Sequence, residues 1–359
     1  MSEATIMNLI LAFRVLLVGG LLFILPRITR KGLLFGVYVG EECAAGNEGR
    51  RLLRSWGVGC AVVMAVSLAV GFSINAAGWP VTGNLTGTGV LLLLALVLYL
   101  RTYSKARGLA LPDADRQAER ATAALQGGET KGELLAKLAL GICLFASLAA
   151  VVYAVVRYQA MPARVSALFT MFIPSLNLLI SPFLALLALL TSRAKRSVRE
   201  GSGGRSAEAQ DAFRATMART ISGGAILICA FLTLLSVQMI RLGLSEISSP
   251  GVVVWVLAGI AFPFLFVNLF RIMKKYGQGG ALIEGSSGGR PLAGGLADNA
   301  RWVWGLFYVD RSDPSVMVEK RFGFGYTFNY GNRNAVWIVV AFLVLALSLV
   351  ALVLAMSLS

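Results

Sequence analysis

The chain has 359 residues, of which 57% are hydrophobic and 14% are charged, and its mean hydropathy is +0.74. A soluble domain carries about a quarter charged residues, so this composition excludes an ordinary soluble globular protein. The net charge is +15, and the placement of the basic residues decides whether that charge indicates nucleic acid or a membrane.

The apolar residues fall in blocks, most of them near the ~20 residues that cross ~30 Å of hydrocarbon as a helix. These blocks predict an all-α polytopic membrane protein of about eight transmembrane helices, with seven or nine as the alternatives. The third block is the shortest, and the fifth carries Pro174 and Pro182, so we expect that helix to be kinked, broken or tilted. The predicted spans lie near 6–26, 56–77, 86–100, 138–156, 165–192, 221–240, 251–270 and 335–357.

The basic residues gather in alternate loops. The connections near 27–55, 101–137, 193–219 and 271–333 hold 29 of the 33 Lys and Arg residues. Cytoplasmic loops carry such an excess, so the distribution predicts that these connections are cytoplasmic and that both termini lie outside. The net charge of the chain then reflects its membrane topology and an attraction to anionic membrane lipids. No nucleic-acid-binding motif accompanies the charge, and we expect no nucleic-acid partner.

Catalytic and metal-binding residue types are scarce. The chain has no histidine, which excludes histidine-held haem and Ser–His–Asp triads. Its four cysteines are isolated, without the clustering of a zinc site, and three of them are expected to be small core residues. The predicted spans contain no central Asp or Glu. We therefore expect a non-enzymatic protein with no catalytic residues, metal or cofactor.

Three polar residues inside the predicted spans are candidates for lining an intramembrane cavity. Arg14 is the only charge well inside a predicted span, and Asn177 and Asn268 follow prolines that free backbone carbonyls. The alternative for Arg14 is snorkelling or a polar contact within the helix bundle. For the two asparagines, the alternative is packing between helices.

Residues 301–334 form an aromatic, glycine-rich segment between a helical membrane region (1–300) and the last helix (335–359), and we expect it to be cytoplasmic. Phe322, Phe324, Tyr326, Phe328 and Tyr330 alternate, which predicts five rings on one face of a strand. Asp313-Pro314 between two β-prone runs predicts a strand–turn–strand unit, a small β-hairpin-like element. Two interpretations remain: a cap on the helix bundle, or a surface that contacts a partner or lipid headgroups. The candidate contact residues are Trp302, Trp304, Phe307, Tyr308, Lys320, Arg321, Phe322, Phe324, Tyr326 and Phe328.

This C-terminal run resembles a signature of bacterial integral membrane proteins of unknown function, W-x-x-G-x-F-Y-x-N-x-x-D-P followed by V-x-K-R-F-G-x-G-x-T-x-N. Asp310 stands where asparagine is usual. KKYGQGGALI at 274–283 resembles the family's G-Q-G-G segment, and FGVYVGEE at 35–42 resembles its F-G-V-x-V-P block. RYQAMPARVSALF at 157–169 is similar to an element shared with distantly related toxin-immunity membrane proteins. The resemblance implies a multi-span protein of the bacterial cytoplasmic (inner) membrane and no particular activity.

Two functions follow as hypotheses. The first is a non-catalytic accessory subunit, or an immunity or sensing factor, that binds another membrane protein or complex through the aromatic segment and basic loops. The second is a permease or binding protein for an apolar or lipid-like solute, using broken helices in the fifth and seventh spans.

Overall fold

The architecture comes from a computed structural model of the whole chain. It describes residues 3–29, 31–110, 131–159, 167–195, 205–280, 282 and 299–358.

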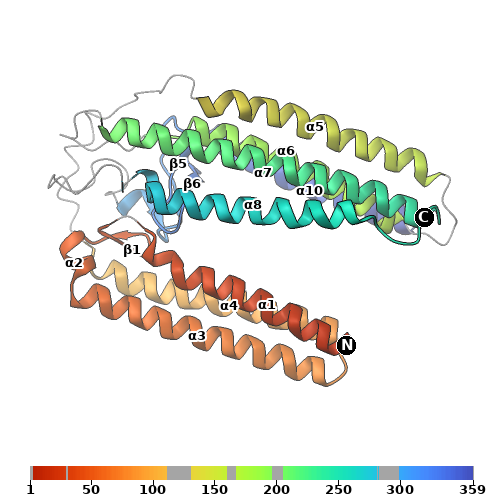
Figure 1. Ribbon diagram of the computed structural model, residues 1–359. Helices are drawn as coiled ribbons and strands as arrows, with labels where there is room; N and C mark the ends of the chain where they lie inside the picture. The colour runs from red at the N-terminus through yellow and green to blue at the C-terminus, as the bar shows by residue number, and fades with distance from the viewer. Residues whose placement is uncertain are drawn as a thin grey trace.

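Eight helices are long and apolar enough to cross a membrane, which confirms the predicted fold class. Figure 1 shows them side by side, with both chain termini at one end of the bundle (the terminal end) and the short strands at the other (the hairpin end). The long helices are α1 (Glu3–Ile24), α3 (Asn47–Ala76), α4 (Pro80–Arg107), α5 (Lys131–Tyr158), α6 (Ala167–Ser192), α7 (Arg205–Gly243), α8 (Val252–Tyr276) and α10 (Arg333–Leu358).

The third span is longer than expected. The sequence predicted 86–100, but α4 runs from Pro80 to Arg107. Its first turns contain Gly83 and Gly87, which lie so close to α3 that an added Cβ would meet that helix's backbone oxygens at 2.6 and 3.0 Å. Packing against α3 therefore extends the helix through polar residues that hydropathy alone assigned to a loop.

The helices form two groups (Figure 1). Helices α1, α3 and α4 pack on one another as the N-terminal group, and α5, α6, α7, α8 and α10 form the C-terminal group. Every helix pair with extensive contact lies within one group. The groups are joined chiefly at the hairpin end, where the aromatic segment packs against both.

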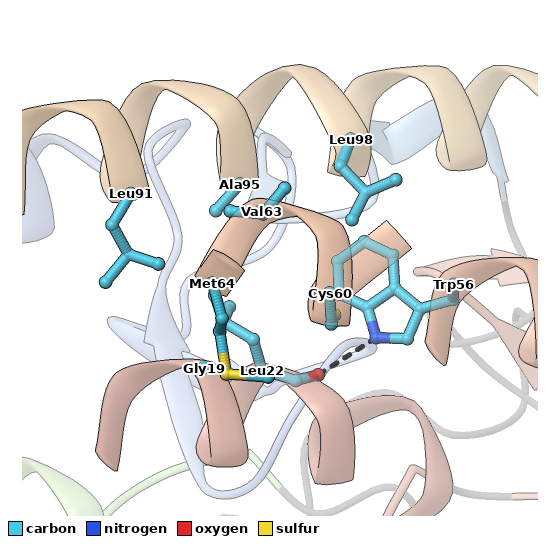
Figure 2. A pocket seen from close by; sticks show the side chains of 9 residues that line it. All are labelled: Gly19, Leu22, Trp56, Cys60, Val63, Met64, Leu91, Ala95 and Leu98. Atoms are coloured by element: carbon cyan, nitrogen blue, oxygen red, sulfur yellow. Dashed lines mark hydrogen bonds between the residues drawn. The ribbon is translucent and has the colours of Figure 1, made fainter. Parts of the chain in front are cut away.

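A tryptophan stabilises the end of α1. Pro26 has no N–H, so the carbonyl of Leu22, four residues earlier, loses its helical donor. The indole Nε1 of Trp56 in α3 donates to that carbonyl at 3.0 Å. Figure 2 shows this bond beside a narrow apolar gap between α1, α3 and α4. The bond fixes the point where α1 passes into the 3₁₀ turn η1 (Leu25–Arg27).

Three antiparallel hairpins cover the hairpin end. β1 pairs with β2, β3 with β4, and β5 with β6, and an isolated parallel bridge links Tyr308 to Asn329. The sequence predicted one strand–turn–strand unit with its turn at Asp313-Pro314. That register is wrong, because those residues connect two separate hairpins. The strands are β1 (Leu33–Leu34), β2 (Val37–Tyr38), β3 (Trp302–Val303), β4 (Phe307–Tyr308), β5 (Met317–Glu319) and β6 (Tyr326–Phe328).

Two glycines bring the first two hairpins into backbone contact. A Cβ on Gly36, in the β1–β2 turn, would lie 2.4 Å from the carbonyl oxygen of Gly305, and one on Gly305 would lie 2.8 Å from the Gly36 Cα. Both residues also have positive φ, which glycine adopts without steric cost. Residues 33–38 and 302–308 therefore pack as one unit although 263 residues (39–301) lie between them.

The aromatic residues after β5 do not share one strand face, which corrects the sequence prediction. Gly323 and Gly325 have φ values of +88° and +97°, so the backbone between them is not extended. Phe322 packs with Phe35, Trp56 and Tyr99 of the N-terminal side. The next two rings, of Phe324 and Tyr326, pack on Phe213 of α7. Residues 322–326 thus form the joint between the two helix groups.

Candidate functional site

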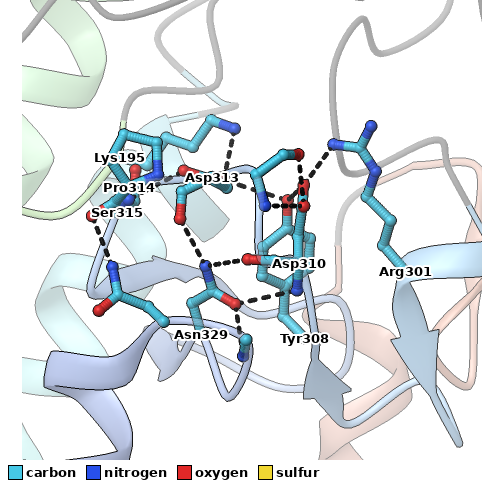
Figure 3. A network of polar contacts seen from close by, with 11 residues as sticks. Lys195, Arg301, Tyr308, Asp310, Asp313, Pro314, Ser315 and Asn329 are labelled. Atoms are coloured by element: carbon cyan, nitrogen blue, oxygen red, sulfur yellow. Dashed lines mark hydrogen bonds and ion pairs between the residues drawn. The ribbon is translucent and has the colours of Figure 1, made fainter.

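A polar network fills the space behind the β3–β4 hairpin (Figure 3). Its centre is the buried hydroxyl of Tyr308, which lies 3.3 Å from Asp310 Oδ2 and 3.1 Å from Asp313 Oδ2. Each carboxylate has its own cation: Arg301 contacts Asp310 at 2.6 Å, and Lys195, just beyond α6, contacts Asp313 at 2.7 Å. The network therefore ties the hairpins to the C-terminal helix group.

Asn329 connects the strands of this network through its side chain. Its Nδ2 donates to the carbonyls of Asp310 and Asp313 at 2.9 and 3.0 Å, and its Oδ1 accepts from the backbone N–H of Asp310 at 3.0 Å. Asn332 continues the chain into the last span, because its Oδ1 accepts from the N–H of Asn334 and so caps α10. Its amide also donates to the Pro314 carbonyl at 2.7 Å.

The two carboxylates of the network are held ionised. Burial alone would raise the pKa of Asp310, but hydrogen bonds from Ser312 and the charge of Arg301 outweigh burial and lower it. Burial would likewise raise the pKa of Asp313, but the contacts with Lys195 and Ser315 outweigh burial and lower it. Burial and the nearby Asp313 charge raise the pKa of Tyr308. These groups form a satisfied structural network, and in the described residues no group of three metal-ligating side chains occurs.

A glutamine from the G-Q-G-G segment fixes the joint. Gln278 Nε2 donates to the Gly325 carbonyl at 2.9 Å, and the Gly325 N–H donates back to Gln278 Oε1 at 2.9 Å. This two-way pairing replaces the hydrogen bonds that a neighbouring strand would supply. It attaches residues 320–325 to the end of α8.

The ten predicted contact residues divide by burial. Trp302, Tyr308, Arg321 and Phe322 are buried inside the protein, so their side chains are not available to a partner in this fold. Arg321 is 1% exposed; its Nη1 donates to Asn299 Oδ1 at 2.8 Å and to the Gly36 carbonyl at 3.3 Å. Half-buried positions are held by Lys320, Phe324, Tyr326 and Phe328.

Trp304 and Phe307 remain exposed, and with Val303 and Val309 they form an apolar patch on the β3–β4 hairpin (the hairpin patch). Trp304 is 54% exposed, and its carbonyl accepts from the Tyr99 hydroxyl at 2.9 Å. Tyr99 lies 20 residues after Trp79 along the chain, or ~30 Å at 1.5 Å per residue, which equals the hydrocarbon thickness. The patch and Trp79 are therefore separated along α4 by about the thickness of a hydrocarbon core.

The three residues predicted to line an intramembrane cavity do not come together. Arg14 lies in the N-terminal helix group and donates to Asn84, whereas Asn177 is in the C-terminal group and donates to Thr233 at 2.9 Å. Asn268 donates to the Phe264 carbonyl of its own helix. Helices α6 and α8 are also continuous through Pro174, Pro182 and Pro263, so the predicted breaks are wrong.

The gap shown in Figure 2 does not supply a solute site either. It is too narrow to hold a water molecule and is lined by apolar residues such as Leu22 of α1, Val63 of α3 and Leu91 of α4 (Figure 2). Ligand pockets are usually about 300–1,000 Å³. This gap between α1, α3 and α4 therefore gives no support to the permease hypothesis.

Sequence reasoning missed several residues that organise the site. Asn84 was assigned to a loop, and Lys195 and Asn299 carried no local signal because their partners are distant in sequence. Arg301 pairs with Asp310 only nine residues along the chain, but that contact depends on the β3–β4 hairpin, which the sequence did not predict. A signal did exist for β1–β2, since Phe35-Gly36 between apolar residues is a two-residue hairpin turn. The segment similar to toxin-immunity proteins lies largely outside the described residues, at 160–166.

The fold is that of a multi-pass membrane protein with eight candidate spans. Residues 311–337 match a family described as a family of unknown function (DUF5808). The match lies within the C-terminal run on which the sequence resemblance rests, and it includes Asp313, Arg321 and Asn329. No curated protein and no solved structure matches the chain.

Proposed function

We propose that the protein is a non-catalytic membrane protein that binds another membrane protein through the hairpin patch, as an accessory subunit or as an immunity or sensing factor. The observation that carries this proposal is the exposure of Trp304 and Phe307 on a hairpin whose other side is fully packed.

The backbone at Trp304 supports a functional role for this side chain. Trp304 has a φ of +53°, a conformation that costs roughly 1–2 kcal/mol for a residue other than glycine. Such strain persists where the surroundings impose it, and it gathers at functional sites. Here the Tyr99 hydrogen bond and the Gly36–Gly305 contact hold the turn, so that the indole is presented outward.

The composition of the patch also favours a protein partner. Tryptophan is enriched among the residues that dominate binding energy at interfaces. The Phe307 ring is supported from behind by Tyr330, with ring centroids 5.5 Å apart, and by Trp304 at 6.2 Å. A rigid aromatic pair loses little conformational entropy on binding.

Photocrosslinking in native membranes tests this proposal. A photoreactive phenylalanine analogue is placed at position 304 and, as a control, at Trp337 of α10. Trp337 is 66% exposed and also lies at the hairpin end. We expect position 304 to crosslink one protein species and position 337 to crosslink lipid. Lipid alone from both positions would show that Trp304 serves only as an interfacial anchor.

We further propose the bacterial inner membrane as the location, with the hairpin end cytoplasmic. The basic loops support this orientation. Cys43 provides a natural probe, because it lies in α2 (Glu41–Ala45) at the hairpin end and is partly exposed, whereas the other three cysteines are buried. A membrane-impermeant maleimide should label Cys43 only after permeabilisation. Ser245→Cys, beyond α7 at the terminal end, should be labelled in intact cells, and the reverse pattern would refute the orientation.

A further inference from the structure

A charged side chain lies inside the N-terminal helix group without a carboxylate partner. Arg14 of α1 is partly buried, and its Nη2 donates to the side-chain oxygen of Asn84. Its Nε is buried without an acceptor. A guanidinium has five N–H donors, so most of them have no acceptor in the described part of the chain. An intramembrane charge in this state is costly unless an anion completes its surroundings.

The polar groups around Arg14 do not supply that anion. Asn84 Nδ2 donates to the carbonyls of Met7 and Pro80 at 3.0 and 3.1 Å, and the amides of Asn75 and Asn8 lie 2.6 Å apart. These amides are neutral and are already engaged with one another or with the backbone. They position the guanidinium and leave its charge unbalanced.

Two other arginines at the terminal end have a carboxylate partner. Arg157 and Arg241 both pair with Glu246, at the ends of α5 and α7. Within the described residues Arg14 has no equivalent carboxylate. The missing anion at Arg14 is therefore not a general property of this end of the molecule.

The position of Arg14 suits a lipid phosphate. Asn84 follows Trp79 by five residues, or ~7.5 Å along a helix, so the guanidinium lies just inside the interface marked by that tryptophan. Side chains on a helix lean toward its N-terminus, which directs Arg14 toward the headgroups. Ile10 and Leu17, on the same side of α1, are exposed to the surrounding lipid.

We propose that Arg14, positioned by Asn84, binds the phosphodiester of an anionic phospholipid in the leaflet at the terminal end. The planar fork of the guanidinium matches two phosphate oxygens, and the anionic lipid neutralises the charge. A partner's carboxylate is the less favoured ligand, because its own span would have to carry it into the membrane at a cost, whereas a lipid phosphate already lies at the boundary. This site is independent of the hairpin patch, which is at the opposite end.

Native mass spectrometry of the purified, delipidated full chain tests the site, with dioleoyl phosphatidylglycerol and dioleoyl phosphatidylcholine as probes. We expect Arg14→Gln to weaken binding of the first phosphatidylglycerol about tenfold, with little effect on phosphatidylcholine. Arg241→Gln is the matched control, because it removes a paired arginine from the same end, and its lipid binding should equal that of the wild type.

Arg14→Lys keeps the charge but loses the fork, so it provides a second test if the glutamine variant does not fold. Its phosphatidylglycerol binding should fall below that of Arg241→Gln. Equal phosphatidylglycerol binding by wild type and both Arg14 variants would overturn the proposal. Loss of a co-purifying protein from Arg14→Gln, with lipid binding unchanged, would assign the site to a partner's carboxylate instead.

Discussion

The two helix groups differ in how they accommodate polar side chains within the membrane. In the C-terminal group, Asn177 is fully buried, donates to Thr233 and accepts from Ser181 at 2.7 Å. In the N-terminal group, Arg14 retains donors without acceptors. The two groups have similar hydropathy, but they differ in this respect. The C-terminal group satisfies Asn177 with its own side chains, whereas in the N-terminal group Arg14 needs an acceptor from a bound ligand.

The groups also differ in how they attach to the hairpins. The N-terminal group uses an aromatic cluster around Trp56 and Phe322, whereas the C-terminal group uses Phe213 together with ion pairs such as Lys195–Asp313. The joint at 322–326 must satisfy both. Perturbing each side separately shows whether the groups depend on one another.

The largest expected effect is at Arg321. Arg321→Met leaves the Gly36 carbonyl without this buried donor and removes one of two donors to the Asn299 side-chain oxygen, which keeps the Tyr38 N–H at 3.0 Å. Because both lost bonds come from a buried charge, we expect a loss of about 4 kcal/mol in stability. The measurement is thermal unfolding followed by size-exclusion chromatography. Arg311→Met is the control, because Arg311 is exposed and its loss should cost at most about 0.5 kcal/mol. Equal effects would mean that Arg321 does not anchor the hairpins.

The two aromatic neighbours of the joint should act on different helix groups. Phe322→Ala removes a buried ring and should cost about 3 kcal/mol, whereas Phe324→Ala removes a half-buried ring and should cost about half as much. Hydrogen exchange should rise at the hairpin end of α3 in the first variant and of α7 in the second. Increased exchange in both helices from either variant would show that the groups behave as one unit.

A smaller effect is expected at Asn177. Asn177→Ala removes an interhelical hydrogen bond to Thr233 and an intrahelical one from Ser181. We expect a loss of about 1 kcal/mol in stability, the usual scale for such bonds in membranes. Asn268→Ala is the matched control, since Asn268 bonds only to its own helix, and its change should be a few tenths of that. A larger effect at Asn268 would reverse the assigned roles.

The smallest effect at neutral pH concerns the carboxylates of the network. Because folding lowers the pKa values of Asp310 and Asp313, their contribution is complete above the unfolded value of about 3.9 and is lost as pH falls through the folded values. Stability should be unaffected by these groups between pH 8 and 5 and should fall below about pH 4. Asp313→Asn should make that acid loss shallower, and an unchanged profile would contradict the role of Asp313.

The sequence was sufficient for features that depend on local composition. Hydropathy predicted eight spans, and the aromatic run at 301–334 predicted a hairpin-like element before the last helix. It was insufficient where distant residues meet. The Arg14–Asn84 contact joins α1 to α4, and the joint depends on positive φ at two glycines. The glycines between the aromatic residues were a sequence signal against a regular strand. The sequence could not show which helix each ring contacts, because that depends on tertiary packing.

The two glycines of the joint also determine which residues of this segment should be substituted together in related chains. Because Gly323 and Gly325 turn the backbone, Phe322 and Phe324 belong to separate packing environments. A substitution at Phe322 should therefore be accompanied by changes at Phe35, Trp56 or Tyr99, and one at Phe324 by changes at Phe213. In related sequences, neighbouring aromatic residues would then evolve independently, while the glycines between them stay fixed.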